Sequence, residues 1–523
     1  KIDLHKPILN DYKSKEHGGV EEPRKILIEA SNGASDYGNK FGEPLIQGFT
    51  RSCGVEVRPW TSLKEIRLNK EYYEWKKPIM FSGGMGWMLN VHLHKLKPEW
   101  GMIIVRLGGP AYRIGIGGGA ASSRDNSSKH DKQNFNAVQR GDPEMENRMN
   151  RVIRTCVEMG EDNPILSIHD QGAGGMANSI QEIMEPNGGR VFLSTIILGD
   201  ETMTDLEIWI SEHQEQNTCL VDISKLYKLR KICRRENCPM ATVGYITNTE
   251  KIEVFSKNDR NKLVVDLPLN KILGKIPPKG YELENKFLKY NNCKNYYGKF
   301  YSNFNKYLFN TAHYLTINED NIDLPEENLV FNNILKKVLG DISIGSKRFL
   351  TNKADRSVTG LVAQQQCVGP LQTPLSNVAV IASDYFNIEG GAMAIGEQPL
   401  KGLIDPEAMA RMAVGEMLSN LVWAPWSSIN DIKISGNWMW PMKYPGEKEK
   451  MYLAATALSE VLIELGPGIA IDGGKDSLSM AVKIEERVVK SPGNLVLSGY
   501  VTCPNITKTI TPDLKGKSST ALL

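Results

Sequence analysis

The stretch IHDQGAGG at residues 168–175 decides how the fold is interpreted. It ends an apolar run, residues 164–169, that predicts a β-strand, and its glycines predict a turn that opens into a helix. The stretch is therefore typical of a strand–turn–helix unit in an α/β domain. Asp170 at the end of the strand is in a common position for a Mg²⁺ ligand, and equally in the position of a helix cap. We interpret His169 as a buried structural histidine rather than a catalyst.

The segments around this stretch extend the same unit. Residues 102–107 predict another strand, and residues 143–159 predict a helix with apolar residues at helical spacing. That apolar face is formed by Met149, Val152, Ile153 and Cys156. We therefore expect one glycine-dense α/β unit over residues 78–265.

Two further segments of this unit are candidates for chemistry. The glycine-rich loop GIGGGAASS, residues 115–123, would let main-chain N–H groups approach an anion, although it also suits a tight turn. Its spacing matches neither a Walker loop nor a GxGxxG fingerprint. Residues 208–216 predict a short apolar strand that runs into a polar cluster. Such a cluster can hold a polar small molecule, but from the residues alone a solvated strand end is the favoured interpretation.

A second α/β unit is predicted over residues 335–485. It follows a segment rich in Lys, Asn and Tyr, residues 266–334, which we interpret as a surface connector. Residues 378–382 predict a buried strand, and Asp405 followed by Pro406 predicts the start of a long helix. Residues 486–523 are expected to begin another strand-rich unit, and we expect the chain to be part of a longer polypeptide, cut at both ends.

The long helix carries a second candidate metal site. Glu416 and Asn420 are four residues apart, so both side chains leave the same helix face, among apolar neighbours. A buried carboxylate is unfavourable without a partner, which a metal ion with its phosphates would supply. The alternative is a partly exposed polar edge. Residues 355–360 and 472–480 are expected to be polar turns of the kind that handle phosphate, with Lys475 as a point charge.

Composition excludes several classes of protein. The 523 residues are 41% hydrophobic and 24% charged with a formal net charge of +2, which argues against a nucleic-acid partner and a membrane surface. No apolar run is long enough to span a bilayer, and no secretory signal is seen. The eight scattered cysteines suit a cytosolic protein without a zinc site. No Ser-His-Asp order or HExxH motif indicates a hydrolase.

Longer blocks of the sequence resemble the synthetase core of the formylglycinamide ribonucleotide amidotransferase (FGAM synthase) family. The blocks keep the family's order and span nearly the whole chain. They are residues 28–44 (IEASNGASDYGNKFGEP), 117–123 (GGGAASS), 137–146 (AVQRGDPEME), 169–175 (HDQGAGG), 351–357 (TNKADRS), 364–370 (QQQCVGP), 435–440 (SGNWMW) and 472–480 (DGGKDSLSM).

The resemblance implies a ligase that forms a C–N bond in purine biosynthesis. ATP activates the amide oxygen of formylglycinamide ribonucleotide (FGAR), and ammonia derived from glutamine replaces it. The implied fold is α/β (α+β), with two tandem pairs of units like aminoimidazole ribonucleotide (AIR) synthetase. Residues 1–77 would end the first N-terminal-type unit and 78–265 form its C-terminal-type partner. Residues 335–485 would form the second N-terminal-type unit, and 486–523 would start its partner.

The resemblance also assigns roles to residues. The substrate-binding positions are Gln139, Glu212, His213 and Gln214. Asp170 falls where the family holds Mg²⁺. Glu416, Asn420 and Asn377 match Mg²⁺ ligands of an auxiliary ATP or ADP site, beside the nucleotide-binding position Ser376. Where the family usually has Asp this chain has Asn377, which removes a negative charge from that site and is expected to weaken metal–nucleotide binding.

The resemblance further implies what other segments supply. The family's histidine-bearing ATP loop would lie upstream, and the glutaminase domain that releases ammonia would lie downstream. We therefore assign no catalytic residue and expect the chain alone to lack complete activity. One alternative is a single-pair enzyme of the same ATP-using superfamily, which the doubled architecture disfavours. The other is a non-catalytic nucleotide-binding or scaffold relative.

Overall fold

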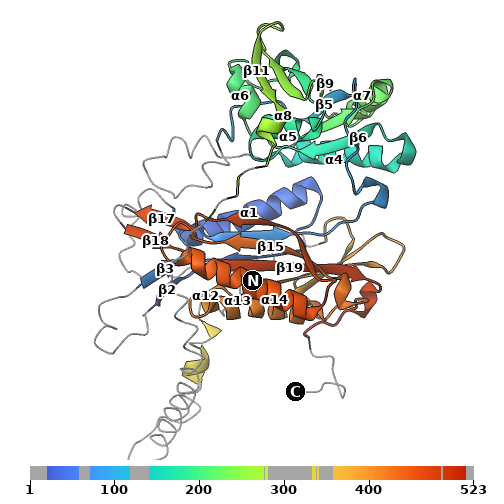
Figure 1. Cartoon of the computed structure of the whole chain (residues 1–523). Helices are drawn as coiled ribbons and strands as arrows, with labels where there is room; N and C mark the ends of the chain where they lie inside the picture. Colours follow the sequence, from blue (N-terminus) through green and yellow to red (C-terminus); the bar gives the residue numbers. More distant parts are fainter. Residues whose placement is uncertain are drawn as a thin grey trace, which may run out of the picture.

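The computed structural model contains two α/β bodies, one built on a seven-stranded sheet and one on a six-stranded sheet (Figure 1). The structure describes residues 21–57, 71–117, 141–275, 277–278, 280, 332–336, 339–340, 357–484 and 487–513. Within these residues no helix is long and apolar enough to cross a membrane.

The seven-stranded sheet has the order β11-β10-β7-β9-β5-β8-β6. All neighbouring pairs are antiparallel except β10 and β7. The strands are β5 (Ile103–Gly108), β6 (Ile165–Asp170), β7 (Gly189–Phe192), β8 (Gln216–Val221), β9 (Met240–Ile246), β10 (Lys251–Phe255) and β11 (Leu263–Pro268). The predicted strands at 102–107 and 164–169 are confirmed as β5 and β6.

Helices cover both faces of this sheet because its central strand buries side chains on both sides. On β5, Val105 and Leu107 pack with α4 (Pro143–Glu158) and α7 (Leu226–Arg235), whereas Ile104 packs with α5 (Gly175–Met184) and α6 (Asp205–Ile210). The predicted helix at 143–159 is confirmed: Met149, Val152 and Cys156 are buried, and Asp142 caps its first turn.

The expected strand at residues 208–210 is wrong. These residues form the end of α6, whose start is fixed by a capping box between Thr204 and Glu207. A short apolar run does not distinguish a buried helix from a strand, and here the cap decides in favour of the helix.

The six-stranded sheet has the order β12-β13-β14-β19-β15-β16. Its strands are β12 (Val362–Gln364), β13 (Val378–Ala382), β14 (Gly390–Glu397), β15 (Lys433–Met439), β16 (Ala470–Ser477) and β19 (Asn494–Cys503). Two long helices, α13 (Pro406–Leu421) and α14 (Glu447–Leu465), pack on it and close the largest core cluster. The predicted strand at 378–382 and the helix start at Asp405 and Pro406 are confirmed. Residues 472–477, expected to be a turn, lie in β16 instead.

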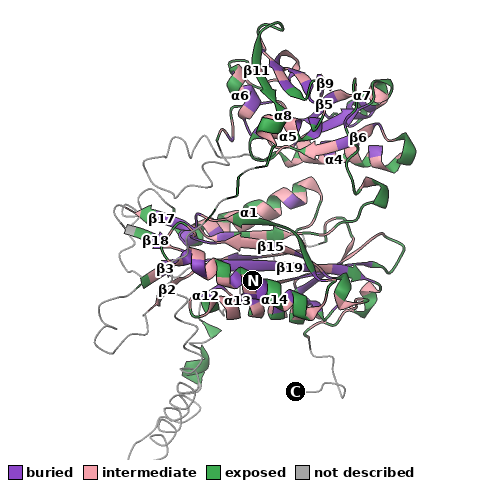
Figure 2. Ribbon diagram, in the orientation of Figure 1, coloured by how far each residue is buried: buried purple, intermediate pink, exposed green. Residues whose placement is uncertain are grey.

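The structure differs from three expected boundaries. Strand β19 lies between β14 and β15, so residues 494–503 complete the second unit's sheet rather than begin another unit. Most of β19 is buried (Figure 2). Strand β4 (Ile79–Gly83) pairs with β1 (Gln47–Arg51), so the N-terminal piece extends past residue 77. Residues 266–272 belong to the first unit, because β11 and α8 (Leu269–Ile272) include them and Leu269 is buried in its core.

The N-terminal piece is joined to the second unit. Helix α1 (Pro23–Phe41) precedes the two-stranded sheet of β1 and β4. The hairpin of β2 (Gly54–Val57) and β3 (Glu71–Glu74) continues into β18 (Arg487–Lys490) and β17 (Ala481–Ile484), which makes one four-stranded sheet. The remaining short helical elements are η1 (Asn90–His92), η3 (Gly160–Asp162), η4 (Leu193–Thr195), η5 (Ile223–Lys225), α12 (Pro399–Gly402), η7 (Ile429–Asp431) and η8 (Ile506–Lys508).

A buried charge cluster reinforces this joint. The hydroxyl of Tyr73 on β3 lies 3.1 Å from Oε1 of Glu447 on α14. The same oxygen accepts from Nζ of Lys450 at 3.1 Å and Nζ of Lys490 at 3.2 Å. Burial, followed by the negative charge of Glu447, raises the pKa of Tyr73 well above its usual range. The phenol therefore stays protonated and serves as a donor between the two pieces of chain.

Candidate functional site

The predicted polar cluster lies in the loop between α6 and β8. Ser211, Glu212 and His213 are buried there, and only Gln214 and Glu215 are partly exposed. The loop leaves α6 with the Ser211 hydroxyl donating to the Glu207 carbonyl at 2.5 Å. We call residues 212–214 the substrate segment, after the role that the resemblance assigned to them.

The glycine-rich stretches that stood out in the sequence converge on this segment. Oε1 of Glu212 accepts from the N–H of Gly174 at 3.1 Å, just before α5 begins. Gly175 has a φ of +64°, and a Cβ there would lie 2.2 Å from the Ser211 carbonyl oxygen. Gly115 has a φ of +67°, and a Cβ there would lie 2.5 Å from the Cβ of Glu212. These glycines therefore allow α5 and the Gly115 turn to lie directly against the substrate segment.

His213 is held as a neutral imidazole. Its Nδ1 accepts from the N–H of Tyr112 at 3.2 Å, which leaves the proton on Nε2. Burial, followed by the nearby charge of Arg106, lowers the pKa of His213 to about 3. At neutral pH this ring is a hydrogen-bond donor without charge.

Arg106 was not singled out by the sequence. It lies on β5 with only 5% of its surface exposed, and its Nη1 donates to Sδ of Met176 at 3.7 Å. Within the described residues no carboxylate is paired with it. Burial lowers the pKa of its guanidinium to about 9. The alternation of residues in a predicted strand does not reveal that an arginine in it is buried, so the sequence did not predict this cation.

Asp170 lies at the end of β6 as predicted, and its carboxylate is 88% exposed. His169 is mostly buried, as expected of a structural histidine: its Nδ1 lies 2.7 Å from the Asp170 carbonyl oxygen, and its Nε2 contacts Glu182. Among the residues that the structure describes, no group of three or more His, Cys, Asp or Glu side chains is arranged to hold a metal ion. Asp170 therefore offers a single open carboxylate at the end of β6.

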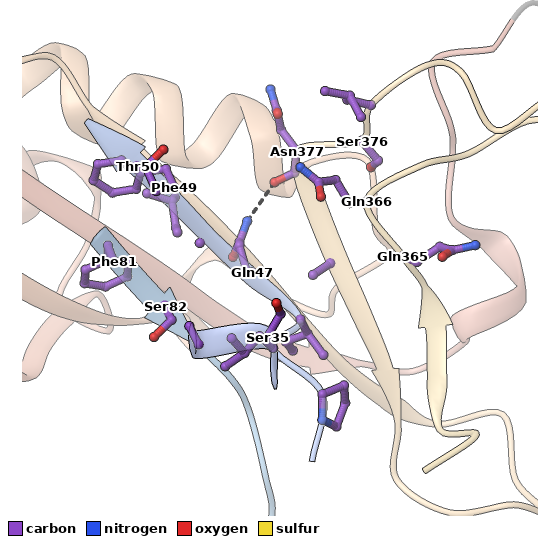
Figure 3. Close-up of a pocket in the computed structure, with 18 of the residues that line it drawn as sticks. Ser35, Gln47, Phe49, Thr50, Phe81, Ser82, Gln365, Gln366, Ser376 and Asn377 are labelled. Carbon is purple, nitrogen blue, oxygen red and sulfur yellow. Dashed lines mark hydrogen bonds between the residues drawn. The ribbon is translucent and has the colours of Figure 1, made fainter. Parts of the chain in front are cut away.

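A separate pocket with a volume of about 250 Å³ opens in the six-stranded body (Figure 3). Three parts of the chain line it: α1, the β1–β4 pair, and the strands and helix of the second unit. Gln47 on β1 points toward Asn377 and donates from Nε2 to the main-chain carbonyl oxygen of Asn377 at 2.9 Å (Figure 3). The pocket is also lined by Ser31, Ala34, Ser35, Asn39, Ser376, Glu397 and Asn420.

This pocket brings together most of the predicted nucleotide and metal residues. Nδ2 of Asn377 lies 3.3 Å from Oδ1 of Asn420, and Ser376 is adjacent. The Ser376 hydroxyl accepts from Nε2 of Gln364 at 2.6 Å and donates to the Val378 carbonyl at 3.0 Å. The two side-chain amides therefore meet as hydrogen-bond donor and acceptor beside Ser376.

Glu416 is placed differently from the two amides. Its Oε2 accepts from the N–H of Glu397 at 2.9 Å and from Nε2 of Gln398 at 2.8 Å. These bonds fix the end of β14 to α13 and stabilise a partly buried carboxylate without a metal ion. Glu397 itself is buried, pairs with Arg51, and accepts from Nδ2 of Asn494 at 3.2 Å. Sequence reasoning missed Glu397 and Gln47, because both lie in ordinary strand patterns.

Several predicted residues lie outside the described part of the chain. These are Gln139, residues 118–123 of the glycine-rich loop, and residues 351–356. The described cysteines are free thiols, and burial raises the pKa of Cys156 and Cys238 to about 11 and that of Cys233 to about 12. These thiols are core residues rather than nucleophiles.

Comparison with known families matches each α/β body. Residues 99–257 match the family "AIR synthase related protein, C-terminal domain", and residues 346–502 match the "FGAR-AT PurM_N-like domain". The second match ends within β19, in agreement with the position of that strand in the second unit's sheet.

Curated relatives extend the similarity along nearly the whole chain. It is 50% identical over 506 residues to the "Probable phosphoribosylformylglycinamidine synthase, chloroplastic/mitochondrial" of Arabidopsis thaliana, covering 95% of this chain and 33% of that protein. It is 46% identical over 518 residues to the human phosphoribosylformylglycinamidine synthase, covering 95% of this chain and 35% of that protein. This chain is a homologue of phosphoribosylformylglycinamidine synthase. It spans about a third of the length of the relatives it matches.

Solved structures of the synthase from Thermotoga maritima share the fold. The protein titled "T. maritima PurL complexed with FGAR" matches with a TM-score of 0.60 at 18% identity, covering 98% of this chain and 67% of that chain. "T. maritima PurL complexed with ATP" matches with a TM-score of 0.57 at 18% identity, covering 93% and 65%. The mixed α/β architecture expected of a synthase homologue is thus confirmed.

Proposed function

We propose that this chain is the ATP-dependent synthetase part of a phosphoribosylformylglycinamidine synthase in purine biosynthesis. The observation that carries the proposal is the 50% identity over 95% of the chain to a synthase of that name. In the proposed reaction ATP phosphorylates the amide oxygen of FGAR, ammonia derived from glutamine attacks the same carbon, and phosphate leaves. Because the chain spans about a third of its relatives, we propose that turnover requires further polypeptide.

We propose that FGAR binds at the substrate segment. Glu212, His213 and Gln214 present a carboxylate, a neutral imidazole and an amide from one buried loop, and Gln139 is proposed to join them. The neutral His213 supports the proposal, since its Nε2–H can donate to a polar ligand without adding a charge. Asp170 is proposed to hold the Mg²⁺ that accompanies ATP, as an exposed carboxylate at a strand end.

We propose that the pocket beside Ser376 binds a second adenine nucleotide, ATP or ADP, with Mg²⁺. The closeness of the Asn377 and Asn420 side-chain amides beside Ser376 supports it, because each amide carries an oxygen of the kind that Mg²⁺ binds. Glu416 is proposed to act from the adjacent helix turn, with its carboxylate at the end of β14. Mg²⁺ would supply charge to neutralise the nucleotide phosphates. We propose the cytoplasm as the compartment; the Arabidopsis relative carries chloroplastic/mitochondrial in its name.

The nucleotide proposal is tested with Asn377→Asp. Mg·ADP affinity of the chain is measured by isothermal titration calorimetry, and nucleotide that co-purifies is quantified after acid extraction. The added carboxylate is expected to tighten Mg·ADP binding about 10-fold and to leave metal-free ADP unchanged, because a charge replaces a neutral ligand of Mg²⁺. Equal affinities in both proteins, or binding by neither, would overturn the assignment of this pocket.

The substrate proposal is tested by titrating FGAR into the chain. His213→Ala is expected to weaken FGAR binding at least about 10-fold, since it removes a buried donor. Glu201→Gln, an exposed change 12 residues away in sequence, serves as the control. FGAR binding that is equal in the His213 variant and the parent chain would exclude the substrate segment. Formation of formylglycinamidine ribonucleotide by the isolated chain with ATP, Mg²⁺ and ammonium would contradict the need for further polypeptide.

A further inference from the structure

Helix α1 touches both proposed ligand sites. Ser31, Ala34, Ser35 and Asn39 line the pocket, at the i, i+3, i+4, i+8 spacing of one helix face. Tyr37 follows Ser35 by two residues, or about 200° around the helix, so it leaves the opposite face. That face lies toward the seven-stranded body, where α1 contacts α4 (Figure 1).

The side chain of Tyr37 contacts Glu215, the residue that follows the substrate segment. Its hydroxyl donates to Oε1 of Glu215 at 2.8 Å, across 178 residues of sequence. The close fit is shown by Gly141, where an added Cβ would lie 2.6 Å from the Tyr37 ring. A second bond joins α1 to α4 of the same body and runs from Nδ2 of Asn147 to the Phe41 carbonyl at 2.6 Å. The contact therefore fixes α1 against the seven-stranded body at two points.

Glu215 determines how the chain leaves the substrate segment. Its φ is +53°, a left-handed backbone that only a small fraction of non-glycine residues adopt. Its carbonyl oxygen accepts from the N–H of Gly109 at 3.2 Å, while its carboxylate also accepts from the main chain of Asp142. Three elements are thus tied to one residue that turns the loop into β8. Because Tyr37 is bonded to Glu215 at this turn, it also restricts the orientation of residues 212–214.

The surrounding charges make the Tyr37 bond important. Glu215 and Glu43 lie near Glu146, and burial together with the charges of these two carboxylates raises the pKa of Glu146 to about 7. Burial also raises the pKa of Glu215, which the Tyr37 and Asp142 hydrogen bonds oppose. The phenol is therefore one of the few groups that favour an ionised, fixed carboxylate in an acidic neighbourhood.

We propose that Tyr37 is a positioning residue: through Glu215 it holds the substrate segment in place from the helix that lines the nucleotide pocket. Tyr37 does not touch the proposed substrate, so its effect passes through the backbone at residues 212–215. The link to FGAR rests on the proposed function, whereas the positioning itself does not.

The positioning is tested without any ligand by hydrogen exchange of peptides covering residues 211–217. Tyr37→Phe keeps the ring and removes the hydroxyl, so protection of these amides is expected to fall about 10-fold, the size of one charge-assisted hydrogen bond. Glu215→Gln keeps an acceptor for the phenol and is expected to retain most of the protection. Tyr452→Phe, an exposed tyrosine on α14, is the matched control. Unchanged exchange in Tyr37→Phe overturns the proposal.

A second measurement separates this inference from the proposed function. FGAR and Mg·ADP affinities are measured for the parent chain and Tyr37→Phe. The expected result is a loss of about 10-fold for FGAR with Mg·ADP unchanged within about 2-fold. If the parent chain binds no FGAR while Tyr37→Phe still loosens residues 211–217, the substrate assignment fails and the positioning role stands. If FGAR binds equally to both proteins, Tyr37 does not position the site.

Discussion

The buried imidazole of His213 makes folding sensitive to acid. Its folded pKa of about 3 lies below the ordinary value of 6.5, so between these values the unfolded chain binds a proton that the folded chain does not. The stability from His213 is complete above pH 6.5 and is lost as pH falls toward 3. We expect the free energy of unfolding to fall by as much as about 1.4 kcal/mol per pH unit in this window from this one group.

The change His213→Gln removes that titration. Urea unfolding followed by circular dichroism at pH 7, 6 and 5 is expected to show a shallower pH slope in the variant than in the parent chain. The slopes are compared rather than the absolute values, because the substitution also removes packing. His94→Gln, at an exposed site, controls for the loss of a histidine. Parallel slopes in His213→Gln and the parent would show that this ring is not the acid-sensitive group.

For single residues, the sequence predicted the position in a strand or helix better than it predicted the contacts of the side chain. Asp170 was expected at a strand end and lies there, and the side chain of His169 is mostly buried with Nε2 in contact with Glu182. Arg106 and Glu397 were not predicted, because their significance comes from partners or missing partners far away in sequence. Helix spacing made Glu416 a candidate metal ligand and the resemblance matched it to one, but neither can show that one of its oxygens meets the main chain of Glu397.

At the scale of elements, the start of α5 depends on glycine at one position and not at another nearby. Gly175 has a left-handed backbone with the Ser211 carbonyl in the place of a Cβ, whereas nothing lies within 4 Å of a Cβ at Gly172. Gly175→Ala is expected to destabilise the fold by about 3 kcal/mol, from backbone strain and the clash together. Gly172→Ala is expected to change it by less than about 0.5 kcal/mol. Thermal unfolding of both variants measures this, and equal melting temperatures would contradict it.

Elements with strong local signals were predicted well from the sequence. The helices at 143–158 and 406–421 each have an Asp cap and a proline in the first turn, and both begin where predicted. The helix at 205–210 was mistaken for a strand because six residues are too few to show helical periodicity. The boundary after residue 485 was misplaced for another reason: a strand's pattern does not reveal which sheet it joins, and β19 pairs with strands that end about 55 to 100 residues earlier.

At the scale of the whole molecule, the joint between the N-terminal piece and the second unit depends on Glu447. Its side chain is 1% exposed, and its Oε1 accepts from Tyr73, Lys450 and Lys490. Glu447→Ala leaves two lysines without this partner, and we expect a loss of about 3 kcal/mol in the free energy of unfolding, measured by urea denaturation.

The control for this prediction is Glu460 on the same helix, whose exposed ion pair reaches Arg411 on α13. Glu460 meets Arg411 at 2.8 Å with 56% of its side chain exposed, so Glu460→Ala is expected to change stability by less than about 1 kcal/mol. Equal effects of the two substitutions would show that the buried cluster does not secure the joint.

The four-stranded sheet of β2, β3, β18 and β17 cannot be completed until late in synthesis of the chain. The hairpin of β2 and β3 is made early, but β18, which pairs with β3, lies about 400 residues later. At roughly 5–20 residues per second the nascent hairpin waits about 20–80 s with one edge unpaired. An open strand edge invites pairing with other chains, so this interval is the part of synthesis most exposed to aggregation. Pausing translation before residue 487 would prolong it, whereas supplying residues 447–503 as a separate polypeptide would shorten it.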